Sequence, residues 1–221
     1  MSRVLVIAPH PDDEVLGCGG TIVRHAREGQ VYLCIVTRAY PPEWPVEQIK
    51  KRKREVLRVN KILGIKKTFF LNLPTVKLDT LPQKGLNELI TGVVQKIKPE
   101  IVYIPHRGDL NKDHNIVFDA AMVALRPRSN SAPIKVLSYE TLSETEWSAP
   151  LVENYFIPDV YVNISGTLEL KLKAMSEYKL ELKEFPHPRS LEALTALARL
   201  RGSTIGVEAA EAFMLIREIW R

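Results

Sequence analysis

Short runs of apolar and β-branched residues recur along the first two thirds of the chain, each bounded by turn-forming residues. They lie at 3–8, 31–37, 68–71, 101–104 and 134–139. Runs of this length and composition are typical of buried strands. Between them the apolar residues recur three and four positions apart, at 14–28, 46–63, 86–97 and 115–125. This second spacing predicts amphipathic helices that alternate with the strands.

The alternation of strand and helix predicts a Rossmann-like α/β fold, with a mostly parallel sheet and helices on both of its faces. Gly29 and Gly64 follow the first two helices and suit left-handed C-terminal caps. No linker-like stretch or internal repeat divides the chain, so we expect residues 1–221 to form a single domain. After residue 160 the pattern indicates a short strand and then helices, at 161–164, 168–182, 191–200 and 207–221.

The net charge of +5 comes largely from lysines and arginines clustered at 50–58. Because this cluster lacks interleaved aromatic residues and any nucleic-acid-binding motif, a solvated helix face is the better interpretation. Neither a signal peptide nor an apolar run of transmembrane length is evident. Cys18 and Cys34 lie in apolar sequence and fit free buried thiols. We therefore expect a cytoplasmic protein without nucleic-acid partners or membrane insertion.

The first predicted strand leads directly into His-Pro-Asp-Asp-Glu at residues 10–14. Carboxylates at the start of a helix gain from its dipole and its free N–H groups, so capping accounts for one of these acids. Capping does not account for a histidine and three acids together. Neighbouring carboxylates repel one another, and a bound cation relieves that repulsion. The segment therefore predicts a metal or catalytic site.

The fourth predicted strand ends in a second polar segment, Pro-His-Arg-Gly-Asp-Leu-Asn-Lys-Asp-His at residues 105–114. Parallel strands end at one edge of the sheet, so the two segments are expected to converge. His10, one of the aspartates and His114 would then supply two nitrogens and one carboxylate, the ligand set of an open catalytic zinc site. Zinc lowers the pKa of a bound water molecule, and a nearby carboxylate can accept the proton as water attacks a carbonyl carbon. The combination predicts a hydrolase.

These residues resemble the PIG-L/LmbE-like zinc-dependent de-N-acetylases, whose hallmark is Ala-His-Pro-Asp-Asp-Glu after the first strand and a later Asp-His pair. Pro9 stands here where alanine is usual. The resemblance implies Asp12 as the general base and Asp113 as a residue that orients the catalytic imidazole system. It implies Zn²⁺, or another divalent metal in its place, bound by His10, Asp13 and His114.

The resemblance extends to the pocket wall. Arg52 lies in an Arg-x-x-Glu helix whose arginine commonly faces the substrate in this family, with a surface cation as the alternative. Asp109 and His106 are further candidates for the wall. The run Phe-Pro-His-Pro-Arg-Ser at 185–190 is similar to the tail of a subgroup of bacterial members.

One position departs from the family pattern. Many members have a histidine three residues before the second zinc histidine, and here that residue is Asn111. Asparagine can donate a hydrogen bond but cannot deliver a proton at neutral pH. We suggest that His187 replaces the missing histidine as general acid, with an ordinary loop histidine as the alternative.

The resemblance implies removal of the N-acetyl group from an N-acetylglucosamine-type sugar or conjugate, with a small-molecule N-acetylated sugar as the partner. Two alternatives stay open: a metal-dependent hydratase on the same scaffold, and a non-catalytic sugar- or nucleotide-binding α/β module. Free acetate distinguishes the first, because a hydratase releases none. The scaffold often assembles, so a homo-oligomer is also an open expectation.

Overall fold

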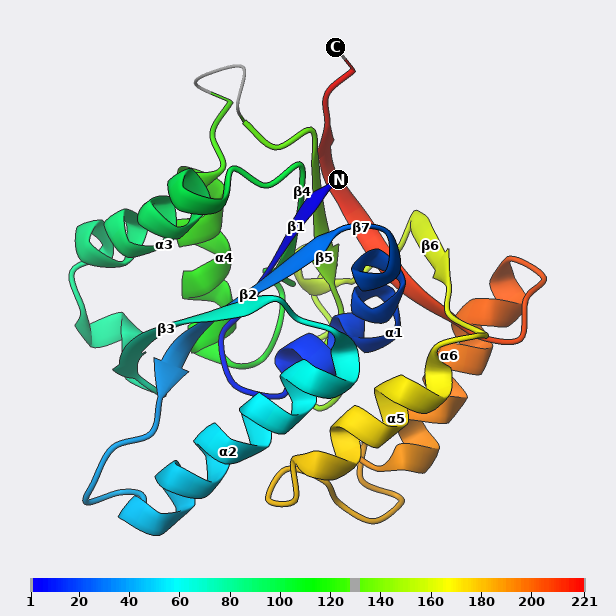
Figure 1. Cartoon of the computed structure of the whole chain (residues 1–221), viewed down its shortest axis with the longest axis horizontal. Helices are drawn as coiled ribbons and strands as arrows, with labels where there is room; N and C mark the ends of the chain where they lie inside the picture. The colour runs from blue at the N-terminus through cyan, green and yellow to red at the C-terminus, as the bar shows by residue number, and fades with distance from the viewer. Residues whose placement is uncertain (1, 128–131, 221) are drawn as a thin grey trace.

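A seven-stranded sheet with the order β3-β2-β1-β4-β5-β7-β6 organises the chain in the computed structural model, which describes residues 2–127 and 132–220 (Figure 1). Strands β1 to β5 pair in parallel, whereas β7 runs antiparallel to both β5 and β6. The mostly parallel α/β sheet predicted from the sequence is confirmed. The strands are β1 (Arg3–Ala8), β2 (Gln30–Arg38), β3 (Lys67–Pro74), β4 (Ile101–Pro105), β5 (Lys135–Tyr139), β6 (Val160–Asn163) and β7 (Ala210–Glu218).

Helices cover both faces of the sheet (Figure 1). One face carries α1 (Asp13–Glu28), α2 (Val46–Leu63), α5 (Leu168–Glu177) and α6 (Leu191–Thr204). The other carries α3 (Gln83–Ile97) and α4 (Lys112–Ala124). Residues 4–8 of β1 are all apolar because both faces of this strand are buried. Val4 and Val6 enter the first core, and Leu5 and Ile7 enter the second. Two short 3₁₀ turns, η1 (Leu78–Thr80) and η2 (Val152–Asn154), lie in the connections.

Glycines allow the close approach of α1 to its surroundings. A Cβ atom on Gly17 would lie 2.3 Å from Cδ2 of the Tyr139 ring, so any larger residue would push α1 away from β5. Gly64 has a φ of 75° and caps α2 in the left-handed conformation, as predicted. Gly29 does not, because its backbone is extended. Glycine is required there by space, since a Cβ would lie 2.6 Å from the carbonyl oxygen of Ser2.

The helix predicted at 207–221 is wrong, because most of this segment is strand β7. Residue 221 lies outside the described residues. Alanine and glutamate at 208–212 favour a helix intrinsically. The segment instead fills the space between β5 and β6, where Ala212 and Phe213 are 2% and 0% exposed. Pairing on both sides and burial of the side chains outweigh the local preference.

Two other boundaries differ from the predictions and matter for the site. Helix α4 begins at Lys112 rather than at residue 115, because the Oδ1 atom of Asn111 accepts a hydrogen bond from the backbone N–H of Asp113 at 3.0 Å and caps the helix. Asp113 and His114 therefore lie in its first turn. Helix α5 ends at Glu177, so residues 178–190 form an irregular connection to α6.

Cys18 and Cys34 are buried free thiols, and no helix in the described part of the chain is both long and apolar enough to span a membrane.

A buried ion pair ties β7 to α1 and α5. Nζ of Lys171 lies 2.6 Å from Oε1 of Glu211 and 2.9 Å from the carbonyl oxygen of Leu16. The two carboxylate oxygens of Glu211 also accept hydrogen bonds from the backbone N–H groups of Gly20 and Thr21. Both charged side chains are about 5% exposed or less. The contact compensates two charges that burial would otherwise penalise.

We expect Lys171→Met to lower the free energy of unfolding by about 3–5 kcal/mol, because it leaves the Glu211 carboxylate buried without its cation. Urea denaturation measures this change. The matched control is Lys135→Met, which removes a pair to Glu218 with side chains 30% and 33% exposed and should cost less than about 1 kcal/mol. Equal losses in the two variants would contradict the prediction.

Candidate metal centre and active site

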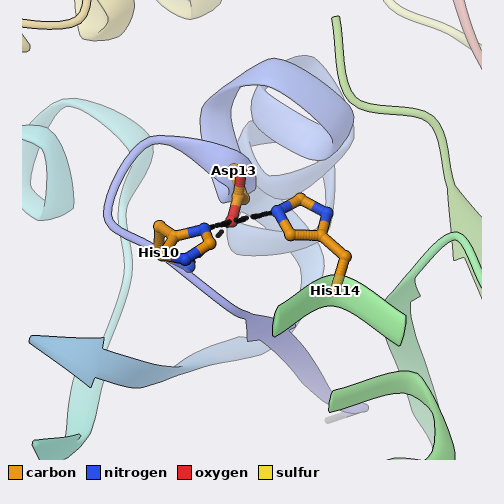
Figure 2. Close-up of side chains that lie close together, drawn as sticks. All are labelled: His10, Asp13 and His114. Carbon is orange, nitrogen blue, oxygen red and sulfur yellow. Dashed lines mark hydrogen bonds and ion pairs between the residues drawn. The ribbon is translucent and has the colours of Figure 1, made fainter. Parts of the chain in front are cut away.

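Three side chains from two distant segments meet at the carboxyl edge of the sheet (Figure 2). His10 follows β1, Asp13 begins α1, and His114 lies in the first turn of α4. The Nδ1 atom of His10 lies 3.3 Å from Nε2 of His114, and each of these atoms lies 3.3 Å from Oδ2 of Asp13. Strands β1 and β4 are neighbours and parallel, so the segments that follow them emerge side by side.

This triangle of two nitrogens and one oxygen fits a tetrahedral metal ion. Ligand atoms about 2.0–2.2 Å from a tetrahedral zinc ion lie roughly 3.3–3.6 Å from one another, close to the separations between the three side chains. A second observation agrees: Oδ1 of Asp13 is buried and has no hydrogen-bond partner among the described residues. A buried carboxylate oxygen without a partner is costly, and a cation removes that cost.

A carboxylate backs each of the two imidazoles. The other ring nitrogen of His10, Nε2, lies 3.0 Å from Oδ2 of Asp113, and Nδ1 of His114 lies 2.8 Å from Oδ2 of Asp109. Backbone N–H groups of Val76 and Leu78 donate to Asp113, and the hydroxyl of Thr145 donates to Asp109. Carboxylate–histidine pairs fix the tautomer and direct the free nitrogen towards a metal.

The charges of the cluster raise the pKa values of the two histidines and lower that of Asp13. Burial alone would lower the pKa of His10, but hydrogen bonds to Asp113 and Asp13 raise it to about 9. Burial likewise acts against His114, yet Asp13 and Asp109 raise its pKa well above the usual range. Burial opposes ionisation of Asp13, but the charge of His114 and the hydrogen bonds of both imidazoles hold its pKa below the usual range. The negative electrostatic potential that favours protonated imidazoles also favours a divalent cation bound by neutral imidazoles.

We expect Asp109→Asn to weaken zinc binding by about 10- to 100-fold, because the amide no longer fixes the His114 imidazole with a charged acceptor. Competition with a chromophoric chelator measures the affinity. Asp119→Asn removes the same charge from the exposed face of α4, where Asp119 is 61% exposed, and should leave the affinity unchanged. A similar loss in both variants would show that only the net charge matters.

Asp12 stands beside the triad in a strained conformation. Its φ of 115° is rare for any residue with a side chain, and its carboxylate is buried. The backbone N–H of Asp12 donates to Oε2 of Glu14 at 3.0 Å, while Tyr178 donates its hydroxyl proton to Oε1 at 2.5 Å. Burial raises the pKa of Glu14 to about 7. The third acid of the motif therefore holds the loop in place through both of its carboxylate oxygens.

The side-chain partner of Asp12 is Arg189, which was not among the site residues predicted from the sequence. Nη1 of Arg189 lies 3.2 Å from Oδ2 of Asp12. Burial raises the pKa of Asp12 well above its usual range, and the Arg189 guanidinium offsets part of this rise. The only signal in the sequence was the position of Arg189 in the run at 185–190, two residues after a histidine singled out for another role.

Arg52 is linked to Arg189 through a shared carboxylate, that of Glu181. Its guanidinium pairs with Glu181, lies 3.4 Å from Oε2 of Glu55 and stacks over the ring of Tyr178 at 5.4 Å. Glu181 also accepts a hydrogen bond from Arg189 at 2.9 Å. The Arg52 side chain is thus 17% exposed and belongs to this network of ion pairs.

The other predicted residues lie outside the triangle of metal ligands. Nε2 of His106 bonds to the carbonyl oxygen of Asn154 at 2.9 Å. Nδ1 of His187 accepts a hydrogen bond from the backbone N–H of Arg189 at 3.0 Å, and its ring packs edge-on against Trp147. Among the described residues, no hydrogen bond joins either histidine to the metal ligands. Asn111 uses its oxygen as the cap of α4.

Comparison with known proteins places these features in a family. A family model described as PIG-L, GlcNAc-PI de-N-acetylase, matches residues 5–125. The chain is 32% identical over 185 residues to the uncharacterized deacetylase YaiS of Escherichia coli (strain K12), which covers 80% of this chain and 90% of that protein. It is 28% identical over 198 residues to diacetylchitobiose deacetylase of Thermococcus kodakarensis, with 83% and 72% covered.

One solved structure shows that the scaffold also occurs with a different chemistry. GalB, the 4-carboxy-2-hydroxymuconate hydratase of Pseudomonas putida KT2440, has a TM-score of 0.78 and 19% identity, and the match covers 100% of this chain and 98% of GalB. This likeness shows the fold alone. The matched family segment, by contrast, contains His10, Asp13 and His114 together with the carboxylates that back the two imidazoles. With that segment and the similarity to YaiS, the chain belongs to the PIG-L family.

Proposed function

We propose that this protein is a zinc-dependent N-deacetylase that acts on an N-acetylglucosamine-type sugar or a conjugate of one. The observation that carries the proposal is the triangle of His10, Asp13 and His114 ligand atoms, 3.3 Å apart, immediately preceded along the chain by the buried Asp12. The names of the relatives YaiS and diacetylchitobiose deacetylase support the reaction and the sugar class.

Different residues serve different steps of amide hydrolysis. A zinc ion held by His10, Asp13 and His114 would polarise the amide carbonyl and make water acidic enough to deprotonate. The Asp12 carboxylate takes a proton from the attacking water. The carbon–nitrogen bond then breaks, and the leaving nitrogen takes up a proton, so that acetate and a free amine are the products.

We assign the proton donor to His187. It lies two residues from Arg189, which contacts Asp12, so its segment is tied to the proposed general base. Asn111 keeps its amide N–H₂ group for a substrate oxygen, and Arg52 with Glu181 offers a donor and an acceptor to sugar hydroxyls. Asp109 and His106 already bond to protein atoms, so we assign them to holding the metal ligand and the pocket loop.

The test is a screen of N-acetylated sugars and their conjugates for acetate and free amine, with chelated and zinc-restored protein side by side. The proposal expects turnover that disappears on chelation and returns with zinc. Addition of water to an unsaturated acid without acetate release would favour a hydratase. Sugar binding without turnover across the panel would favour a binding module.

A further inference from the structure

Arg189 lies where three irregular segments of the chain meet beside the proposed general base. Its Nε donates to Oγ of Ser143 at 2.6 Å, and Nη2 lies 3.1 Å from Oε1 of Glu144, both in the connection after β5. Its Nη1 lies 2.9 Å from Oε2 of Glu181, in the connection between α5 and α6, and 3.2 Å from Oδ2 of Asp12. All three guanidinium nitrogens are thus engaged, and the side chain is 18% exposed.

The Asp12 carboxylate depends on this contact for its direction. The backbone of Asp12 is fixed, because its N–H bonds to Glu14 and its carbonyl oxygen accepts the N–H groups of Val15 and Leu16 at 2.9 Å. Its side chain has no comparable support: among the described residues, Arg189 is the hydrogen-bond donor to the carboxylate. A carboxylate on a fixed backbone still rotates about its side-chain bonds unless a partner selects one orientation.

We propose that Arg189 is a positioning residue that holds the Asp12 carboxylate towards the attacking water. The proposal rests on the deacetylase function proposed above, in which Asp12 is the base. A guanidinium suits the task, because its planar fork can satisfy acceptors in several directions at once, whereas a lysine ammonium on a flexible stem acts as a point charge. Ser143, Glu144 and Glu181 hold the fork in place, so that Nη1 meets Oδ2 of Asp12 from a fixed direction.

The network also explains why the guanidinium can be buried. Glu144 and Glu181 compensate its charge, and Glu181 is shared with Arg52, whose other carboxylate neighbour is Glu55. A loss of Arg189 would therefore release Asp12 and leave the metal ligands untouched, since the imidazoles of His10 and His114 have their own supporting carboxylates and Asp13 bonds to His10 and His114. This separation makes the role testable.

The test compares Arg189→Ala with Arg189→Lys and with Arg201→Ala. Arg201 is a matched control, because its side chain is 20% exposed and makes two hydrogen bonds to Glu140, away from Asp12. In Arg189→Ala we expect kcat to fall about 100-fold, the scale of a misplaced catalytic group, with KM and zinc content close to those of the wild type. Guanidinium ion below its denaturing range should restore part of kcat. Arg189→Lys should retain more activity than Arg189→Ala, and Arg201→Ala should keep its kcat and show no rescue.

Each other outcome overturns the proposal. A loss confined to KM would make Arg189 a substrate-binding residue, and a loss of zinc would make it part of the metal site. Equal losses of kcat in Arg189→Ala and Arg201→Ala, without guanidinium rescue, would reduce it to a structural ion pair. If Arg189→Ala does not fold, the comparison of Arg189→Lys with the wild type decides, because an unchanged kcat there excludes a role for the fork. Zinc-loaded wild-type protein that releases no acetate from any substrate overturns the proposed function itself.

Discussion

Replacing Asp12 by asparagine is expected to lower kcat by about 10²–10⁴-fold, the range for loss of a positioned general base, while zinc stays bound. Asparagine keeps the size of the side chain and tolerates the φ of 115° better than alanine does. It cannot accept the proton of the attacking water. The measurement pairs steady-state acetate release with metal analysis of the same preparation.

The control for Asp12→Asn is Asp79→Asn, which makes the same chemical change at an exposed position in η1 and should leave both kcat and zinc content unchanged. A variant that loses zinc but keeps its turnover per bound metal would assign Asp12 to the metal. In that case the roles of the two neighbouring aspartates would have to be exchanged.

The convergence of His10, Asp13 and His114 could be foreseen because it follows from the order of the strands. His10 and His114 are 104 residues apart, yet each lies just beyond a buried parallel strand, and such strands end at a common edge. Local sequence and a general rule of sheet topology sufficed to bring the two histidines together. The different roles of Asp12 and Asp13 rest on the resemblance to the family, because the acids alone did not distinguish them.

The network around Arg189 could not be foreseen in the same way. Arg189 is 177 residues from Asp12, and it reaches the site through irregular segments whose paths no hydrophobic periodicity encodes. The end of α5 at Glu177 and the formation of strand β7 were likewise not predictable from the local sequence. Both depend on what packs against them, so propensity along the chain predicted helix in each place.

Replacing His114 by alanine is expected to remove the metal itself. His114 is fully buried, and it supplies one of three ligand atoms and separates the carboxylates of Asp13 and Asp109. Without the imidazole only two of the three ligand atoms remain, so zinc stoichiometry should fall far below one per chain and acetate release should be lost with it.

The stability of the His114→Ala variant should also lose its response to zinc. A ligand that binds only the folded state stabilises it by about 2.7 kcal/mol at a concentration of a hundred times its Kd. The melting temperature of the wild type should therefore rise with zinc, while that of the variant should stay unchanged. His25→Gln is the matched control, since His25 lies on α1 and bonds to the hydroxyl of Tyr103 at 2.9 Å. It should keep both the stoichiometry and the shift. Zinc-dependent melting in His114→Ala equal to that of the wild type would mean that the ion binds elsewhere, and the convergence of the two segments would then serve the fold and not the chemistry.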